Sequence, residues 1–405
     1  MAGLTPVDEV IEDLLARAVS IGETEVVPLR LGRGRILARS ISSTIDVPPH
    51  DNSAMDGYVF DGSDESIVVG GTYEVSDRIP AGQVGQTLVP GTLARIFTGA
   101  PIPKGANTVV IQEDTLSRGE KVELTERPGT GANVRPRGQD IARGSELLAH
   151  GHRLKAADVG LLASTGVNEV EVFRKLRIAI MSTGDELVEP PNALAPGQIY
   201  NSNHYTLAAM IEELGLEVVD LGLVADSLTA TVETLKKAAE SADCIISSGG
   251  VSVGEEDHVK AAVESLGSLD LWKVAIKPGK PLAFGSIKAN SDSEPVPFFG
   301  LPGNPVSSFV TFTVIAKPYL LKYQGYNAPE ASSLHAISRF EFEAGGRREY
   351  LRVRLSGGDE LTAELFDGQG SGVMSSVSWS NALAEVEANT KVVAGDRVRV
   401  HPLPA

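Results

Sequence analysis

The sequence predicts a multidomain fold that combines an α/β module with all-β modules. Between residues 176 and 321, apolar strand-like runs alternate with segments of helical periodicity. Before and after this region, short β-rich runs are separated by glycine and proline. With 405 residues, 42% of them hydrophobic, the chain is long enough for several domains that each bury a core.

Composition narrows the classes of function. A formal net charge of −17 opposes binding to nucleic acid or to anionic membranes, so we expect neither as a partner. An anionic substrate then requires a local cationic site. The single cysteine, Cys244, cannot form an intramolecular disulfide and fits the reducing cytosol. Because no signal pattern or bilayer-length apolar run is present, we expect a cytoplasmic protein.

The N-terminal part begins with a predicted helix and continues into β-rich sequence. Thr5 and Pro6 are typical of a helix start, and residues 7–18 place apolar side chains on one helical face. Polar residues crowd between positions 47 and 58, in either an acidic surface loop or a partly buried turn. Short runs between 66 and 126 predict a small all-β module.

Two charged residues follow this β-rich region at close spacing. Arg137 comes three positions before Asp140. A guanidinium group can grip an oxyanion with two donors, but an exposed arginine near a carboxylate is also typical of a solvated surface pair. Spacing alone leaves both interpretations of Arg137 open.

The middle of the chain predicts a three-layer α/β/α module with a mainly parallel sheet. Strands that alternate with helices give parallel sheets covered on both faces. The expected strands are 176–181, 216–223, 242–247, 271–276, 281–285 and 298–301. The expected helices are 202–214, 227–239, 258–266 and 305–321.

The third of these strands leads into a glycine-rich loop that predicts phosphate binding. Glycine removes the Cβ that would hold a ligand away from the backbone N–H groups, although a Gly-Gly pair after a strand is often a simple turn. The candidate substrate-binding residues of this loop are Ser248, Gly249, Gly250, Ser252 and Gly254.

Acids and lysines strengthen the phosphate hypothesis. Glu255, Glu256 and Asp257 follow the glycines and would repel a phosphate unless a divalent cation such as Mg²⁺ lay between them. Lys273, Lys277 and Lys280 follow further along the chain. Together these features predict a metal-bridged phosphate or pyrophosphate site.

Further residues are expected at the same place because they follow strand ends. In open α/β sheets, ligands lie beyond the carboxyl ends of the strands. We therefore expect one edge of the sheet to gather these residues with the glycine loop: Glu186, Asp226, Lys277, Lys280, Pro302 and Asn304. After residue 325 the chain again shows short alternating runs, which predict a small C-terminal β-barrel.

Several motifs follow one another along nearly the whole chain: Asp51-Asn-Ser-Ala-Met-Asp-Gly-Tyr58, Thr98-Gly-Ala-Pro101, Arg137-Gly-Gln-Asp-Ile141, Ser182-Thr-Gly-Asp-Glu-Leu187, Ser248-Gly-Gly-Val-Ser-Val-Gly254, Ile276-Lys-Pro-Gly-Lys-Pro281 and Leu301-Pro-Gly-Asn-Pro-Val-Ser307. In sequence and in order, these motifs resemble those of the molybdopterin molybdenumtransferase family and of the C-terminal part of gephyrin.

The resemblance implies an activity and a domain organisation. It implies that the protein takes adenylylated molybdopterin and molybdate and, with Mg²⁺, makes molybdenum cofactor while releasing AMP. It also implies a homodimer whose site lies between the α/β module of one subunit and the β-rich domain of the other. The expected domains are an elongated linking domain (1–44 and 145–176), a β-rich inserted domain (45–144), an α/β/α domain (177–325) and a C-terminal β-barrel (326–405).

The resemblance and the chemistry of the residues together assign roles. The expected catalytic residues are Asp56, Thr98, Asp140, Lys273 and Lys277. Carboxylates suited to a hard cation are expected at Glu186, Asp226 and Asp257. Arg137 is the expected oxyanion contact.

Two other functions fit parts of the sequence. A molybdopterin adenylyltransferase shares the α/β module, but its glycine loop usually reads Gly-Gly-Thr-Gly, whereas Val251 and Ser252 follow the glycines here. A gephyrin-like scaffold would bind a peptide beside the C-terminal barrel. Transfer of AMP from ATP to the pterin would favour the adenylyltransferase. A pull-down that recovers a stable partner from an enzymatically inactive protein would favour the scaffold.

Overall fold

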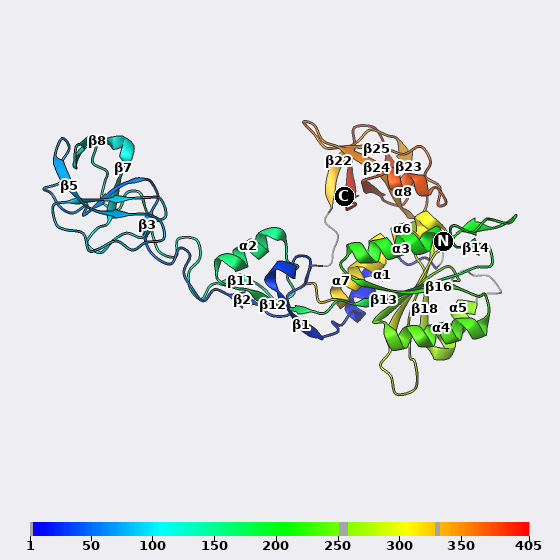
Figure 1. Ribbon diagram of the computed structural model, residues 1–405. Coiled ribbons are helices and arrows are strands. Elements are labelled where there is room, and N and C mark those ends of the chain that lie inside the picture. The colour runs from blue at the N-terminus through cyan, green and yellow to red at the C-terminus, as the bar shows by residue number, and fades with distance from the viewer. Residues whose placement is uncertain (1–2, 251–257, 329–332, 405) are drawn as a thin grey trace.

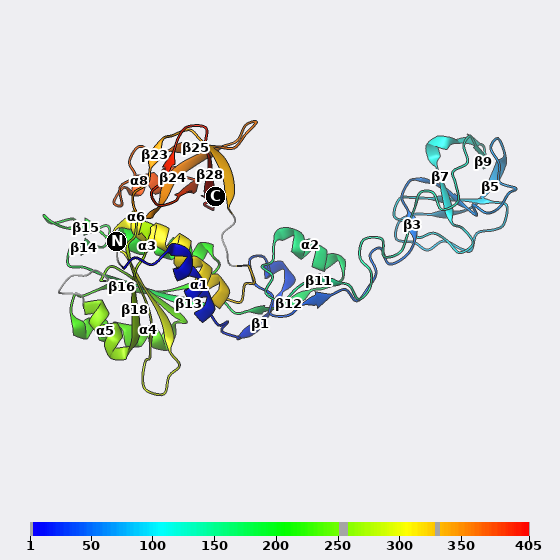
Figure 2. The same ribbon diagram turned by 180° about the vertical axis from the view of Figure 1, so that it is seen from behind.

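The computed structural model describes residues 3–250, 258–328 and 333–404 of the chain. The molecule is elongated: a β-rich module lies at one end, and an α/β module that carries a β-barrel lies at the other (Figures 1 and 2). A narrow linking module joins the two ends. This arrangement of α/β and all-β parts confirms the predicted fold class.

The linking module is built from two separate parts of the chain. β1 (Thr24–Pro28) pairs antiparallel with β12 (Glu169–Phe173), and β2 (Ile41–Ser42) pairs with β11 (Glu146–Leu148). The 3-10 turn η1 (Leu29–Leu31) and helix α2 (Ala156–Ser164) complete the module. Its core includes Leu29, Leu37, Leu162 and Val172, so the outgoing and returning segments share one apolar centre. The β-rich module is thus an insertion into the linking module.

The β-rich module is organised around a six-stranded sheet with the order β7-β4-β6-β5-β9-β8. The strands are β4 (Gly57–Phe60), β5 (Thr72–Ile79), β6 (Leu93–Ile96), β7 (Thr108–Ile111), β8 (Thr115–Arg118) and β9 (Lys121–Leu124). The turn η2 (Gln112–Asp114) joins β7 to β8, and β3 (Asn52–Ser53) pairs with β10 (Val134–Arg135). Gly57 lies so close to β7 that a Cβ would be 1.9 Å from the carbonyl oxygen of Val110. The motif glycine is therefore required for strand pairing.

The α/β module contains a second six-stranded sheet, with the order β16-β13-β17-β21-β20-β18. The strands are β13 (Arg177–Thr183), β16 (Glu217–Val224), β17 (Cys244–Ser248), β18 (Gly267–Lys273), β20 (Pro281–Ile287) and β21 (Val296–Leu301). The first four strands in the sheet order are parallel, and β20 runs antiparallel to both of its neighbours. The predicted mainly parallel sheet is confirmed.

Helices cover both faces of this sheet. One face packs against α1 (Val7–Arg17), α3 (Ser202–Glu213), α6 (Pro305–Thr311) and α7 (Lys317–Tyr323), and the other packs against α4 (Leu228–Ser241) and α5 (His258–Leu266). The helix expected over 305–321 is interrupted by a π-helical turn, η3 (Phe312–Ala316). The interruption precedes Pro318, which has no backbone N–H to continue an α-helical ladder. Within the described ranges, no helix has the length and apolar character needed to cross a bilayer.

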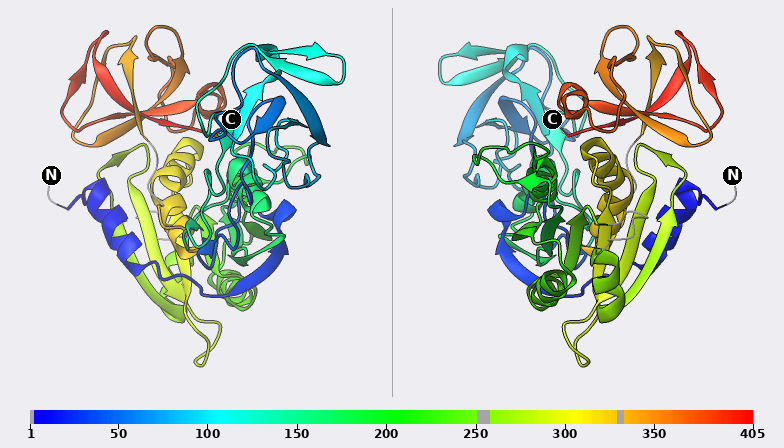
Figure 3. Two further views of the ribbon diagram at one scale, coloured as in Figure 1. Left: turned by 90° about the vertical axis from the view of Figure 1, so that its left-hand side faces the viewer. Right: turned by 90° about the vertical axis from the view of Figure 1, so that its right-hand side faces the viewer.

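The C-terminal module is a closed barrel, as the sequence predicts. β24 (Arg348–Ser356), β25 (Thr362–Leu365), β22 (Leu334–Ser338), β28 (Arg397–Pro402) and β26 (Ala382–Val386) pair in that order, and β26 closes the ring onto β24. β23 (Phe342–Glu343) pairs with β27 (Lys391–Val392), and α8 (Met374–Trp379) precedes β26. The barrel lies against the α/β module (Figure 3). β19 (Ile276–Lys277) of the α/β module pairs with the start of β24 and ties the two modules together.

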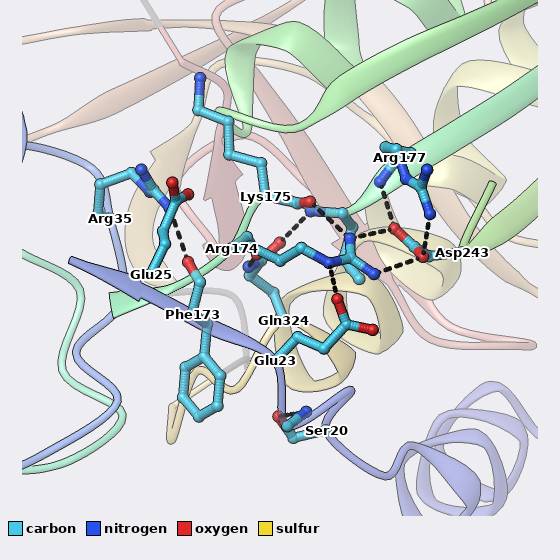
Figure 4. Close-up of polar contacts among 12 residues, drawn as sticks. Ser20, Glu23, Glu25, Arg35, Phe173, Arg174, Lys175, Arg177, Asp243 and Gln324 are labelled. Atoms are coloured by element: carbon cyan, nitrogen blue, oxygen red, sulfur yellow. Dashed lines mark hydrogen bonds and ion pairs between the residues drawn. The ribbon is translucent and has the colours of Figure 1, made fainter. Parts of the chain in front are cut away.

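An ion-pair cluster holds the linking module to the α/β module (Figure 4). Arg174 donates to both carboxylate oxygens of Asp243 at 2.6 and 2.8 Å, and to Glu23 at 2.5 Å. Burial works to raise the pKa of Asp243, but hydrogen bonds from Arg174 and Arg177 outweigh burial and lower that pKa. Gln324 accepts from the N–H of Leu176 and donates to the carbonyl of Arg174. The start of β13 is therefore fixed relative to both modules.

Candidate functional site

A cavity of about 780 Å³ lies at the carboxyl edge of the α/β sheet. Residues that follow β13, β16, β17, β19 and β21 line it, as the strand-end rule predicts. The lining includes these residues predicted from the sequence: Glu186, Asp226, Ser248, Gly249, Gly250, Lys277, Lys280, Pro302 and Asn304. Ser252, Gly254 and Asp257 lie outside the described residues.

The glycine loop requires both of its glycines. Gly249 and Gly250 have φ values of +90° and +68°, a region that favours glycine. A Cβ on Gly249 would lie 3.0 Å from the carbonyl oxygen of Thr183, and one on Gly250 would lie 2.3 Å from a methyl group of Val259. The loop therefore passes close to the end of β13 and presents its backbone to the cavity.

A buried asparagine, which the sequence analysis missed, fastens this loop to its neighbour. Asn203, near the start of α3, donates through Nδ2 to Oγ of Ser248 at 2.8 Å and to the carbonyl of Gly303 at 2.7 Å. These bonds connect the end of β17 to the loop after β21. The sequence indicates this role of Asn203 only in one way: Asn203 is a polar residue in a helix that packs against the sheet.

Cations from two modules also line the cavity. Lys277 ends β19, Lys280 lies in the turn after it, and Arg347 directly precedes β24. Lys277 donates through Nζ to Oε1 of Glu349 at 3.1 Å, and Arg347 donates to the carbonyl of Ile276 at 3.0 Å. The barrel therefore contributes a cation to the cavity.

The carboxylates of the cavity fit a hard divalent cation in chemical type. Glu186 and Asp226 are exposed and line the same cavity, and neither side chain forms an ion pair with another described residue. Carboxylate oxygens are the ligands that Mg²⁺ prefers, together with substrate phosphates. Among the described residues no group of three or more metal-ligating side chains is gathered, and the expected third acid, Asp257, falls outside them.

Lys273 occupies a different position from the other predicted cations. It is exposed at the end of β18 and is not among the residues that line the cavity. Because β20 separates β18 from β21, the carboxyl end of β18 lies to the side of the loops after β13, β17 and β21. The backbone carbonyl of Lys273 accepts a hydrogen bond from Thr5 at 2.9 Å.

The remaining predicted residues belong to the β-rich module. Oδ1 of Asp56 accepts hydrogen bonds from the backbone N–H of Thr98 at 2.8 Å and from its hydroxyl at 2.9 Å. These bonds, the backbone bond first, lower the pKa of Asp56, so the carboxylate is ionised at neutral pH. Asp140 is exposed, and its N–H donates to the carbonyl of Val47 at 3.0 Å.

Arg137 forms an ion pair with Asp46, an acid that the sequence analysis did not single out. Its Nε and Nη2 both lie 2.5 Å from Oδ2 of Asp46, and its N–H donates to Asp51 at 2.7 Å. It also lines a second cavity, of about 380 Å³, with His50 and Asp51. Asp46 precedes Arg137 by 91 residues, so sequence spacing carried no signal for the pair.

The two groups of candidate residues are separated within one chain. Asp56, Thr98 and Asp140 belong to the β-rich module at the far end of the molecule, whereas the cavity belongs to the α/β module and barrel (Figures 1 and 2). A single chain therefore does not bring the two groups together.

The fold and the cavity place the protein in a class of molybdopterin-binding proteins. Most of the residues around the cavity belong to a three-layer module that matches the family described as a probable molybdopterin binding domain, over residues 179–322. The flanking parts match the MoeA N-terminal region (domain I and II) over residues 5–166 and the MoeA C-terminal region (domain IV) over residues 337–403.

The chain belongs to the molybdopterin molybdenumtransferase family. It is 38% identical over 393 residues to the molybdopterin molybdenumtransferase of Haemophilus influenzae, with 94% of each chain covered. It is 34% identical over 365 residues to gephyrin of Dictyostelium discoideum, covering 80% of this chain and 50% of gephyrin. The crystal structure of a molybdopterin biosynthesis moeA protein from Pyrococcus horikoshii OT3 superposes with a TM-score of 0.84 at 29% identity, covering 98% of this chain and 100% of that chain.

Proposed function

We propose that this protein transfers molybdenum, supplied as molybdate, onto adenylylated molybdopterin in a Mg²⁺-dependent reaction that releases AMP and molybdenum cofactor. Membership of the molybdenumtransferase family supports the reaction class. One observation carries the details: a single cavity combines the acids Glu186 and Asp226 with the cations Lys277, Lys280 and Arg347. Family membership also supports a cytoplasmic location.

The cations and the glycine loop account for binding of the adenylylated substrate. The backbone of Gly249 and Gly250 lets phosphate oxygens approach closely, because neither residue carries a Cβ. Lys277 and Lys280 face the same space and offset the negative charge that develops on the departing AMP phosphate. Glu349 holds the ammonium group of Lys277 in place on the cavity wall.

The acids account for the requirement for a divalent cation. Glu186 and Asp226 would hold Mg²⁺ beside the phosphates, since carboxylates alone would repel them. When bound, the cation supplies Lewis-acid neutralisation of the phosphoanhydride. The protein needs no sulfur ligand for molybdenum, because the substrate's dithiolene provides sulfur; Cys244 is fully buried.

A homodimer supplies the second half of the proposed site. Asp56, Thr98 and Asp140 lie on the distal module and cannot line the cavity of their own chain. A two-fold arrangement, the commonest symmetry of soluble oligomers, lets the distal module of one copy reach the cavity of the other. In this arrangement the ionised Asp56, held by Thr98, positions the pterin and molybdate.

A product assay tests the proposal. Purified protein is incubated with adenylylated molybdopterin, Mg²⁺ and molybdate, and AMP is measured with and without molybdate. We expect AMP release that depends on molybdate. In a parallel incubation with ATP and molybdopterin, molybdate-independent formation of adenylylated molybdopterin would instead identify an adenylyltransferase.

A further inference from the structure

A charged residue is completely buried in the barrel behind the cavity wall. Arg352, on β24, has a relative exposure of 1% and is the largest fully buried side chain among the described residues. Its guanidinium donates through Nε to Oγ of Ser376 at 3.1 Å, through Nη1 to the carbonyl of Tyr350 at 3.1 Å and through Nη2 to the carbonyl of Gly370 at 3.4 Å. All three acceptors are neutral.

Burial of this charge is unfavourable without a compensating role. No carboxylate among the described residues forms an ion pair with Arg352. Desolvation lowers its pKa to about 10, and the charge of Glu349 only partly opposes that effect. A buried ion costs more than an apolar side chain of similar volume, so stability alone does not explain an arginine at this position.

The acceptors of Arg352 bracket a loop that forms part of the cavity wall. Gly370 lies at the start of the loop and lines the cavity, whereas Ser376 lies at its end, in α8. Ser376 in turn donates through Oγ to the carbonyl of Val373 at 2.6 Å. The guanidinium therefore connects both ends of the segment 370–376.

The same loop is fixed to the backbone of Arg352 and to the α/β module. Gln369 accepts from the N–H of Arg352 at 2.9 Å and donates to its carbonyl at 3.1 Å. On the other side, the N–H of Val306 in α6 donates to the carbonyl of Ser371 at 3.0 Å. Gln369, Gly370 and Ser371 all line the cavity. Any shift of this loop would move the cavity wall and the start of α6 together.

We propose that Arg352 is a positioning residue of the transferase reaction, whose buried guanidinium holds the wall formed by Gln369, Gly370 and Ser371 in the shape that binds the substrate. The proposal rests on the proposed function for its kinetic consequence. Arginine suits this role because its planar fork reaches three separate acceptors at fixed angles, whereas lysine presents a single ammonium group.

Two variants of Arg352 and one matched control test the role. Arg352→Met removes every side-chain donor at similar volume, and Arg352→Lys restores a charged donor. The control is Arg354→Met, two residues further along β24, because Arg354 is exposed and donates to the carbonyl of Trp379 at 2.8 and 3.1 Å but to no residue that lines the cavity. The readouts are KM and kcat for adenylylated molybdopterin, Tm, and amide hydrogen exchange of residues 369–373.

We expect Arg352→Met to raise KM about tenfold, with a smaller change in kcat, and to accelerate amide exchange in 369–373 at least about tenfold. Arg352→Lys should recover part of both effects. Arg354→Met should lower Tm without changing KM or the exchange of 369–373. Wild-type KM and exchange in Arg352→Met would overturn the proposal, and so would an equal rise in KM in Arg354→Met. An inactive wild-type protein would refute the proposed function, while hydrogen exchange would still decide the role of Arg352.

Discussion

Oε1 of Glu349 accepts a hydrogen bond from Nζ of Lys277 at 3.1 Å, and this contact joins the barrel to the cavity of the α/β module. Glu349 is buried, and the same oxygen accepts from the N–H of Gly345 at 3.2 Å. The two residues are also paired in register where β19 meets β24. The barrel is therefore part of the site rather than an appended domain.

Glu349→Ala should weaken the attachment of the barrel. The substitution leaves Lys277 and the N–H of Gly345 without their acceptor, so we expect a loss of about 1–3 kcal/mol in unfolding free energy. Urea denaturation measures it. Glu349→Gln keeps an acceptor oxygen and should lose less than half as much. Wild-type stability of Glu349→Ala would show that the contact does not hold the modules together.

Asp56→Asn should abolish molybdenum insertion and leave the protein folded. The amide oxygen of asparagine still accepts from Thr98, so the turn is kept while the charge is lost. We expect molybdate-dependent AMP release to fall by a factor on the order of one hundred or more.

Asp64→Asn is the matched control for this substitution. Oδ1 of Asp64 likewise accepts from a backbone N–H and a hydroxyl, both of Ser66, at 2.9 and 2.6 Å. It belongs to the same module, outside the candidate site, and its substitution should leave activity unchanged. Full activity of Asp56→Asn, or equal losses in both variants, would remove Asp56 from the site.

Mixing two inactive variants should restore activity if the site is shared between subunits. Asp56→Asn and Glu186→Gln affect different modules, so a mixed dimer keeps one intact site of two. After co-refolding, random pairing makes about half of the dimers mixed, which predicts about one quarter of wild-type activity. A mixture of Asp56→Asn with Thr98→Ala should recover none, because both substitutions affect the same module. Absence of recovery in the first mixture, with mixed dimers present, would contradict a shared site.

The ion-pair cluster around Asp243 should make a contribution to the free energy of unfolding that depends on pH. The pKa of Asp243 is lower in the folded protein than its usual value of about 3.9, so its stabilising effect is complete above that value and is lost as pH falls through the folded pKa. At pH 7 we expect Asp243→Asn to cost about 2 kcal/mol in urea denaturation. The difference from wild type should shrink below about pH 4.

Asp13→Asn serves as the control for Asp243. Asp13 pairs with Arg17 on the exposed surface of α1, with side-chain exposures of 45% and 43%. Such pairs contribute little, so we expect a change within about 0.5 kcal/mol at pH 7. A loss for Asp243→Asn that is no larger, or one that grows on acidification, would contradict the assigned role.

The sequence predicts the elements of this protein better than their long-range contacts. Alternating strands and helices placed Glu186, Asp226 and Lys277 at one sheet edge, because parallel strands share that edge. Lys273 was expected at this site because it lies close to Lys277 and Lys280 in sequence, but it ends β18, which β20 separates from β21, and it does not line the cavity.

Residues that reach the site from distant segments of the chain could not be predicted from their local sequence. Arg347 and Gln369 reach the cavity only because the barrel docks on the α/β module, and Asp46 meets Arg137 only through the fold of the β-rich module. The spacing of residues along the chain predicts neither the docking of the barrel nor the contact between Asp46 and Arg137. Asn203 is similar, since its amide is buried between two loops whose approach depends on the whole sheet.

A crystal structure with AMP and Mg²⁺ bound would test the central claim most directly. The account predicts the phosphate of AMP in the 780 Å³ cavity, between the glycine loop and Lys277, with Mg²⁺ on Glu186 and Asp226. A phosphate bound outside this cavity, or Mg²⁺ bound without either carboxylate, would contradict it.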